Sequence, residues 1–152
     1  MRWSEEISFK KLTLAISEDA NAFDAVMAAM RLPKNTPEEV DCRNSMIRES
    51  AIVAAEIPLK NAELTKDVLK QLVEVSEKGN LNAITDAVTG GALAMAALAG
   101  LGANVRVNLL PYPEEADAAR LLKKLDAIEK DAATLYTTIK ESLKERAGIC
   151  LL

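Results

Sequence analysis

The longest uncharged stretch of the sequence is the feature that most limits its fold. Residues 87–105 contain no Asp, Glu, Lys or Arg, and they are mostly Ala, Gly, Leu, Met and Val. A helix this apolar is expected either in a protein core or subunit interface, or across a membrane. Because Ala and Gly dominate, whereas membrane spans favour Leu, Ile and Phe, we expect a buried helix and no membrane partner.

The segments before this stretch have the periodicity of amphipathic helices. Apolar residues at spacings of three and four predict a first helix from about Ser4 to Leu32. Thr36-Pro37-Glu38-Glu39 has the order of an N-cap, a first-turn proline and a capping-box glutamate, so a second helix is expected there. The stripe of the first helix comprises Phe9, Leu12, Ile16, Ala20, Phe23, Met27 and Met30.

Prolines and glycines predict the later boundaries. Pro58 lacks an amide donor and is expected to kink or divide the second segment, which Lys78-Gly79-Asn80 should end. Asn82 is expected to cap a third helix. Pro113-Glu114-Glu115 predicts the start of a fourth, ending at Gly148.

The predicted fold class is therefore all-α. The apolar residues of the fourth helix alternate spacings of four and three, which suits bundle packing. We expect residues 1–152 to form a single helical domain: a multi-helix bundle with long, proline-kinked helices around a buried Ala- and Gly-rich central helix. The seam of the fourth helix comprises Leu121, Leu125, Ile128, Ala132, Leu135 and Ile139.

Composition excludes several classes of function. The sequence has no histidine, which removes Ser-His and Cys-His catalysis and imidazole metal ligands. Cys42 and Cys150 have no ligand-like spacing, so no metal site is expected. We expect a reduced, cytoplasmic protein. Met1 to Phe9 does not resemble a secretory signal. A net charge of -4 and only 3% aromatic residues argue against a nucleic-acid partner.

Polar residues at the start of the apolar stretch form the first candidate site. Asn82 and Asp86 are one helical turn apart, and an unpaired carboxylate beside a buried helix would be costly. Both side chains could instead cap that helix. Asp86 lies four positions past the expected cap, which weakens the capping interpretation for it.

The end of the stretch carries a second group, Asn104, Arg106 and Asn108. The arginine could bind an anionic ligand in a forked geometry or pair with a carboxylate of the chain. Asp24 lies beside the apolar stripe of the first helix and is a further candidate for substrate binding, with an ion pair or a solvated edge as the alternative.

Several segments resemble the formiminotransferase-cyclodeaminase and methenyltetrahydrofolate cyclohydrolase family. In order and spacing they cover about residues 12–145. The matching segments are Asp19-Ala20-Asn21-Ala22-Phe23-Asp24-Ala25-Val26-Met27, Leu32-Pro33-Lys34, Ala55-Glu56-Ile57-Pro58-Leu59, Lys78-Gly79-Asn80-Leu81-Asn82-Ala83-Ile84-Thr85-Asp86-Ala87 and Asn104-Val105-Arg106-Val107-Asn108-Leu109.

The resemblance implies an all-α homodimer that acts on one-carbon tetrahydrofolate derivatives. Such enzymes close formimino-tetrahydrofolate with loss of ammonia, or add water to the methenyl bridge. The bridge is a cationic amidinium that a carboxylate can stabilise, and Asp86 is the candidate for this catalytic role. Asn82 would orient the ligand or Asp86. Arg106 would meet the glutamate tail or a pterin edge, and Asn104 and Asn108 would supply amide hydrogen bonds.

The sequence departs from the family at its start. Members usually open with a Pro-Thr-Pro-Gly-Gly-Gly-Ser segment before the first helix, but this sequence has no glycine before Gly79. The alternative function is therefore a non-catalytic helical dimerisation or folate-binding module that has lost part of the active site.

Overall fold

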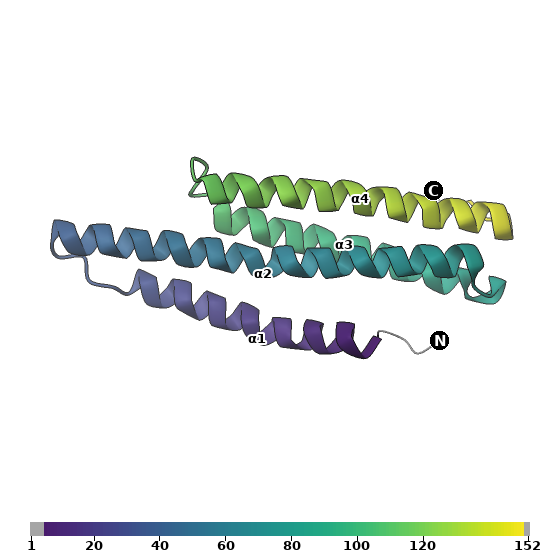
Figure 1. Cartoon of the computed structure of the whole chain (residues 1–152), viewed down its shortest axis with the longest axis horizontal. Coiled ribbons are helices and arrows are strands. Elements are labelled where there is room, and N and C mark those ends of the chain that lie inside the picture. Colours follow the sequence, from purple (N-terminus) through teal and green to yellow (C-terminus); the bar gives the residue numbers. More distant parts are fainter. Residues whose placement is uncertain (1–4, 151–152) are drawn as a thin grey trace. The chain divides into compact units, whose positions relative to one another are not determined.

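The chain is helical along its described length. The computed structural model describes residues 5–150, with side chains from residue 13 onward. It contains the helices α1 (Glu5–Met30), α2 (Pro37–Lys78), α3 (Ile84–Leu109) and α4 (Ala116–Ala147), and the short 3-10 helix η1 (Leu81–Ala83) (Figure 1). The predicted all-α class is confirmed. The expected helix start at Ser4 and the side chains of Phe9 and Leu12 lie outside the described part.

The helices divide into two compact units. Unit 1 comprises residues 1–61 and 103–122, and unit 2 comprises residues 62–102 and 123–152. Unit 1 therefore holds α1, the first part of α2 and the end of α3. Unit 2 holds the end of α2, η1, most of α3 and most of α4.

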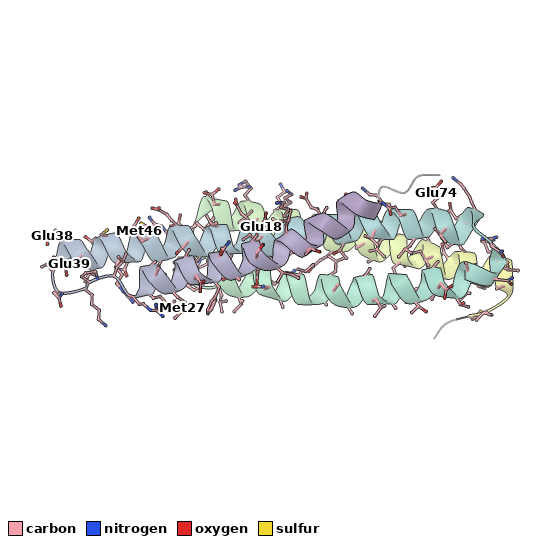
Figure 2. All side chains as sticks on the ribbon, turned by 90° about the horizontal axis from the view of Figure 1, so that it is seen from below. Glu18, Met27, Glu38, Glu39, Met46 and Glu74 are labelled. Atoms are coloured by element: carbon pink, nitrogen blue, oxygen red, sulfur yellow. The ribbon has the colours of Figure 1, made fainter. Side chains whose placement is uncertain are left out.

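The start of α2 in unit 1 is the capping box that the sequence predicts. The amide of Glu39 donates to Thr36 Oγ1 at 3.2 Å, and the amide of Asn35 donates to Glu39 Oε2 at 2.7 Å (Figure 2). The pKa of Glu38 is lowered, first by a hydrogen bond from its own backbone amide and then by one with Thr36. These contacts satisfy amide groups that have no partner inside the helix.

Helix α1 buries small residues. Ala15, Ala22 and Ala29 are buried, at a spacing of seven. The large residues of the predicted apolar stripe lie on the exposed side instead, with Ile16 73% and Phe23 63% exposed. An interpretation of that stripe as the core face is therefore wrong, because the alanines let α1 pack closely through its other face.

Salt bridges connect elements within unit 1. Lys60 Nζ of α2 lies 3.4 Å from Glu18 Oε2 of α1 (Figure 2). Arg48 Nη1 of α2 lies 3.3 Å from Glu115 Oε1, just before α4. The four side chains are between 39% and 61% exposed. These pairs therefore help to orient the helices but contribute little to the stability of the fold.

Pro58 does not divide α2. The helix runs without interruption from Pro37–Lys78, and Pro58 is buried inside it. The missing amide costs about 3 kcal/mol in a helix interior. Burial of the neighbouring Ala54, Ala55, Leu59 and Ala62 offsets that cost, which local sequence signals do not reveal.

The seam of α4 packs as predicted in the part that lies in unit 2. Leu125, Ile128, Ala132 and Ile139 are all at most 2% exposed, whereas Leu135 of the same seam is half-buried. A Cβ atom at Gly91 of α3 would come within 2.9 Å of Tyr136 Cδ2, so glycine permits close contact between α3 and α4 there.

The boundaries of α4 agree with the sequence at one end only. Helix α4 begins at Ala116 and not at Pro113, because a turn in which the Glu115 amide donates to Tyr112 O at 3.2 Å comes first. At the other end Gly148 has a φ of 70°, and its amide donates to Lys144 O at 3.0 Å. This left-handed end favours glycine, as predicted.

The apolar stretch in α3 is buried on one face only. Ala87, Gly91, Ala94 and Leu98 are buried, whereas Leu93 on the other side is 68% exposed. In the single chain the stretch is therefore buried on one side, and its other side is uncovered. By length and composition alone, residues 81–109 could cross a membrane, a test that core helices of soluble proteins also pass.

Candidate functional site

The α2–α3 connection positions the first pair of candidate residues. Asn80 has a φ of -60° and a ψ of 134°, and its Oδ1 accepts the amide of Asn82 at 3.0 Å. Asn80 therefore caps η1, which leads into α3, and Asn82 lies inside η1 and not at the expected cap position. The amide of Ala83 also donates to Asn80 O at 2.9 Å. The side chain of Asn82 is exposed and stays available for a ligand.

Asp86 lies in the first turn of α3. Here its negative charge is favoured by the helix dipole. Its side chain is exposed and forms no hydrogen bond or ion pair with any described residue. The expectation of a buried carboxylate is wrong, because the outer face of α3 is uncovered in the single chain. The capping alternative is not what the structure shows for Asp86 either, since its oxygens hold no backbone amide.

The second candidate group lies in the last turns of α3. Asn108 Nδ2 donates to Asn104 O and to Asn104 Oδ1, both at 3.0 Å. The two half-buried amides therefore bond to each other, which fixes their orientation. Arg106 is exposed between them in sequence and lies in the last turn, where a cation is favoured.

Asp24 of α1 is exposed, and among the described residues it has no ion-pair partner. The ion-pair alternative for Asp24 is therefore not observed. The structure places Asn82 in η1 and Asp86 in the first turn of α3, both in unit 2, and bonds Asn104 to Asn108 in unit 1.

Comparison with known proteins identifies the family. The sequence model of the formiminotransferase-cyclodeaminase family matches residues 3–127, which is most of the chain. The chain belongs to this family. The match spans every candidate residue named above, so the resemblance seen in the sequence is confirmed.

Relatives within the formiminotransferase-cyclodeaminase family differ in length. A methenyltetrahydrofolate cyclohydrolase of Methylorubrum extorquens is 38% identical over 91% of this chain and 67% of its own length. The formimidoyltransferase-cyclodeaminase of Rattus norvegicus is 30% identical over 90% of this chain, which spans only 25% of the rat protein.

A solved structure of the family has the same fold. The crystal structure of formiminotetrahydrofolate cyclodeaminase from Thermotoga maritima matches with a TM-score of 0.79 and 24% identity. The match covers 93% of this chain and 67% of the other. The fold and the relatives together indicate the folate one-carbon cyclohydrolase and cyclodeaminase group.

Sequence reasoning missed one residue that contacts the α2–α3 connection. Arg146, in the last turn of α4, donates from Nη1 to Ser76 O at 2.6 Å and from Nη2 to Gly79 O at 2.8 Å. The available signal was a basic residue just before the predicted helix end at Gly148, a position that suits bonding to helix-end carbonyls.

The described residues offer no obvious metal centre. No group of three or more Cys, Asp or Glu side chains in the described part could hold a metal ion. Cys42 and Cys150 are both exposed and free. The absence of a metal from the reaction stays a prediction.

Proposed function

We propose that this chain is a one-carbon folate enzyme that adds water to the methenyl bridge of methenyltetrahydrofolate. The observation that supports this most is the 38% identity, over 91% of this chain, to a protein named methenyltetrahydrofolate cyclohydrolase. The same stretch of chain contains an accessible, unpaired carboxylate at Asp86. A tetrahydrofolate derivative is the substrate in this proposal, and no metal takes part.

The cationic bridge and the Asp86 carboxylate have complementary charges. Water addition forms a bond between the water oxygen and the methenyl carbon, and a water proton passes to Asp86. One carbon–nitrogen bond of the bridge then breaks. The departing nitrogen takes up one proton and the second water proton is released, which leaves formyl-tetrahydrofolate.

The other candidate residues are proposed to supply folate-binding groups, each within its own unit of the chain: Asn82 in unit 2, and Asp24, Asn104, Arg106 and Asn108 in unit 1. Asn82, one turn before Asp86, orients the ligand or the carboxylate. Arg106 pairs with an anionic part of the folate, the glutamate tail, in a forked geometry. Asn104, Asn108 and Asp24 supply further hydrogen bonds. Their roles follow from side-chain chemistry and from their positions in the matching segments.

The test is turnover of methenyltetrahydrofolate by the purified chain. The absorbance decay of the substrate is compared between the wild type, Asp86→Asn and buffer. We expect the wild type to exceed buffer clearly and Asp86→Asn to lose most of that excess. Equal decay in all three would overturn the enzyme proposal, and folate binding without turnover would instead identify a binding module.

A cyclodeaminase activity is the second candidate. The rat relative and the Thermotoga maritima structure are both named for it. In that reaction a folate nitrogen attacks the formimino carbon, and ammonia leaves with a proton that Asp86 can supply. Ammonia release from formimino-tetrahydrofolate, measured in the same preparation, would favour this reaction over the first.

We also propose a homodimer that uses the outer face of α3. Within unit 2 this face carries no charged residue after Asp86 and exposes Leu93, Ala96, Ala97 and Gly100. Asp86 is seven residues before Leu93 and so lies on the same side of α3. A second copy covering this face would remove apolar area from water and lie beside the proposed site.

Sedimentation in detergent-free buffer tests the dimer. The wild type is expected at twice the mass of one chain, and Leu93→Glu at the mass of one. Val53→Glu, at an exposed position of α2, is the matched control and should leave the mass unchanged. A wild type that sediments as a single chain at high concentration would contradict the proposal.

A further inference from the structure

Arg146 connects the ends of two helices in unit 2. It lies in the last turn of α4, and its guanidinium donates hydrogen bonds to the carbonyls of Ser76 and Gly79 at the end of α2. Carbonyls in the last turn of a helix lack intrahelical donors. A cation is also favoured there by the dipole of each helix, so Arg146 is placed where two negative helix ends meet.

The forked contact spans the point at which the chain turns toward the candidate site. The two acceptors lie on either side of the end of α2 at Lys78. A Cβ atom at Gly79 would clash with Val75 O, so the turn accommodates glycine at this position. The hydrogen bond to Gly79 O therefore fixes the backbone position at which the α2–α3 connection begins.

Hydrogen bonds between near neighbours in sequence then fix the backbone from Asn80 to Ile84. Asn80 Oδ1 accepts the Asn82 amide, and the amide of Ile84 donates to Leu81 O. Ile84 is 2% exposed and anchors the first turn of α3. Asn82 is three positions after Gly79, whose carbonyl accepts the bond from Arg146. Asp86 follows one helical turn after Asn82.

We propose that Arg146 is a positioning residue, whose guanidinium holds the 79–83 turn so that Asn82 and Asp86 keep their placement toward the substrate. The role toward the substrate rests on the proposed function, whereas the placement of the 79–83 turn by Arg146 does not. Arg146 lies beyond residues 3–127, so the family match assigns it nothing.

Hydrogen exchange tests the turn independently of activity. Arg146→Gln removes the charge and the fork, and is expected to raise amide exchange at residues 80–86 at least tenfold. Arg43→Gln is the matched control, because Arg43 Nε donates to Met30 O at 3.1 Å at the end of α1. This control should raise exchange near residues 30–36 only. Unchanged exchange at residues 80–86 in Arg146→Gln would overturn the proposal.

Turnover of methenyltetrahydrofolate tests the link to the site. Arg146→Gln is expected to lower kcat by about tenfold or more, since small misplacements of reacting groups are costly. Arg43→Gln should leave kcat within about twofold of the wild type. Arg146→Lys should recover only part of the loss, because lysine keeps the charge but not the fork. A kcat for Arg146→Gln equal to that of Arg43→Gln would overturn the link.

A double variant separates positioning from general stability. If Arg146 acts through Asp86, adding Arg146→Gln to Asp86→Asn should cause little further loss of kcat. Independent, multiplying losses would mean that Arg146 does not act through Asp86 and would overturn the proposal. A wild type without turnover, together with faster exchange at residues 80–86 in Arg146→Gln, would contradict the proposed function alone.

Discussion

The two ends of α3 differ in whether their polar side chains are exposed and unpaired or half-buried and hydrogen-bonded. At the start, Asp86 and Asn82 are exposed and their side chains bond to no described residue. At the end, Asn104 and Asn108 are half-buried and hydrogen-bonded to each other. Among the described residues, the side chains of the first pair have all their hydrogen-bonding groups free, whereas the second pair already uses Asn108 Nδ2 and Asn104 Oδ1 within the fold.

This difference separates two roles that look alike in the sequence. Both groups are polar residues that flank the same uncharged stretch. A hydrogen bond between side chains restricts rotamers and offsets the cost of partial burial, so it stabilises the folded state. An unpaired carboxylate in the first turn of α3 contributes less to stability and keeps its chemistry available.

The largest effect is expected from Asp86→Asn at the start of α3. Removing a general base or a charge-stabilising carboxylate should lower kcat for methenyltetrahydrofolate by roughly 10²- to 10⁴-fold. The free energy of unfolding should change little, because the side chain is exposed and unpaired. Steady-state kinetics with parallel chemical unfolding measures both. A loss of kcat that follows a loss of folding would contradict the catalytic role.

At the end of α3, Arg106→Gln is expected to act on binding. Loss of a charge-assisted contact with the folate glutamate tail should raise KM by about tenfold, with kcat nearly constant. Kinetics with folate substrates that carry or lack the glutamate tail tests this. An equal rise in KM for both substrates would exclude the tail as the partner of Arg106.

The smallest effects concern stability and use two matched substitutions. Asn108→Ser should lower the free energy of unfolding by about 1 kcal/mol, because it removes the bonds to Asn104. Asn82→Ser should change it by no more than about 0.5 kcal/mol, since its side chain is exposed. Ser and Asn have similar helix propensities, so urea unfolding compares the contacts directly. Equal changes would remove the distinction between the two ends.

The sequence predicted the fold class and most helix ends, because these depend on local signals. Thr36 with Glu39, Gly79 and Gly148 each act through bonds within a few residues, and the structure has those bonds. Division of the helix at Pro58 is the wrong prediction, because local sequence signals do not reveal that Pro58 and its neighbours Ala55 and Leu59 are buried. The sequence does not distinguish Asn80 from Asn82 as a cap, because the two asparagines have the same capping chemistry.

The candidate site was predicted in part. Asn82 and Asp86 were selected together, and the structure places them on successive turns beside Asn80. The exposure of Asp86 was missed, because an uncharged stretch does not show which of its faces is covered. Arg146 was missed because its acceptors, Ser76 O and Gly79 O, are 70 and 67 residues away.

The alanines at positions 15, 22 and 29 of α1 have a consequence for local stability. Each buried methyl removes little area from water, whereas α4 buries Leu121, Leu125 and Ile139. At about 0.8 kcal/mol for each buried CH₂ group, the described part of α1 is held far more weakly than α4. Helix α1 should therefore detach first in transient opening events and offer proteases their earliest cleavage points, while α4 stays folded until the whole chain unfolds.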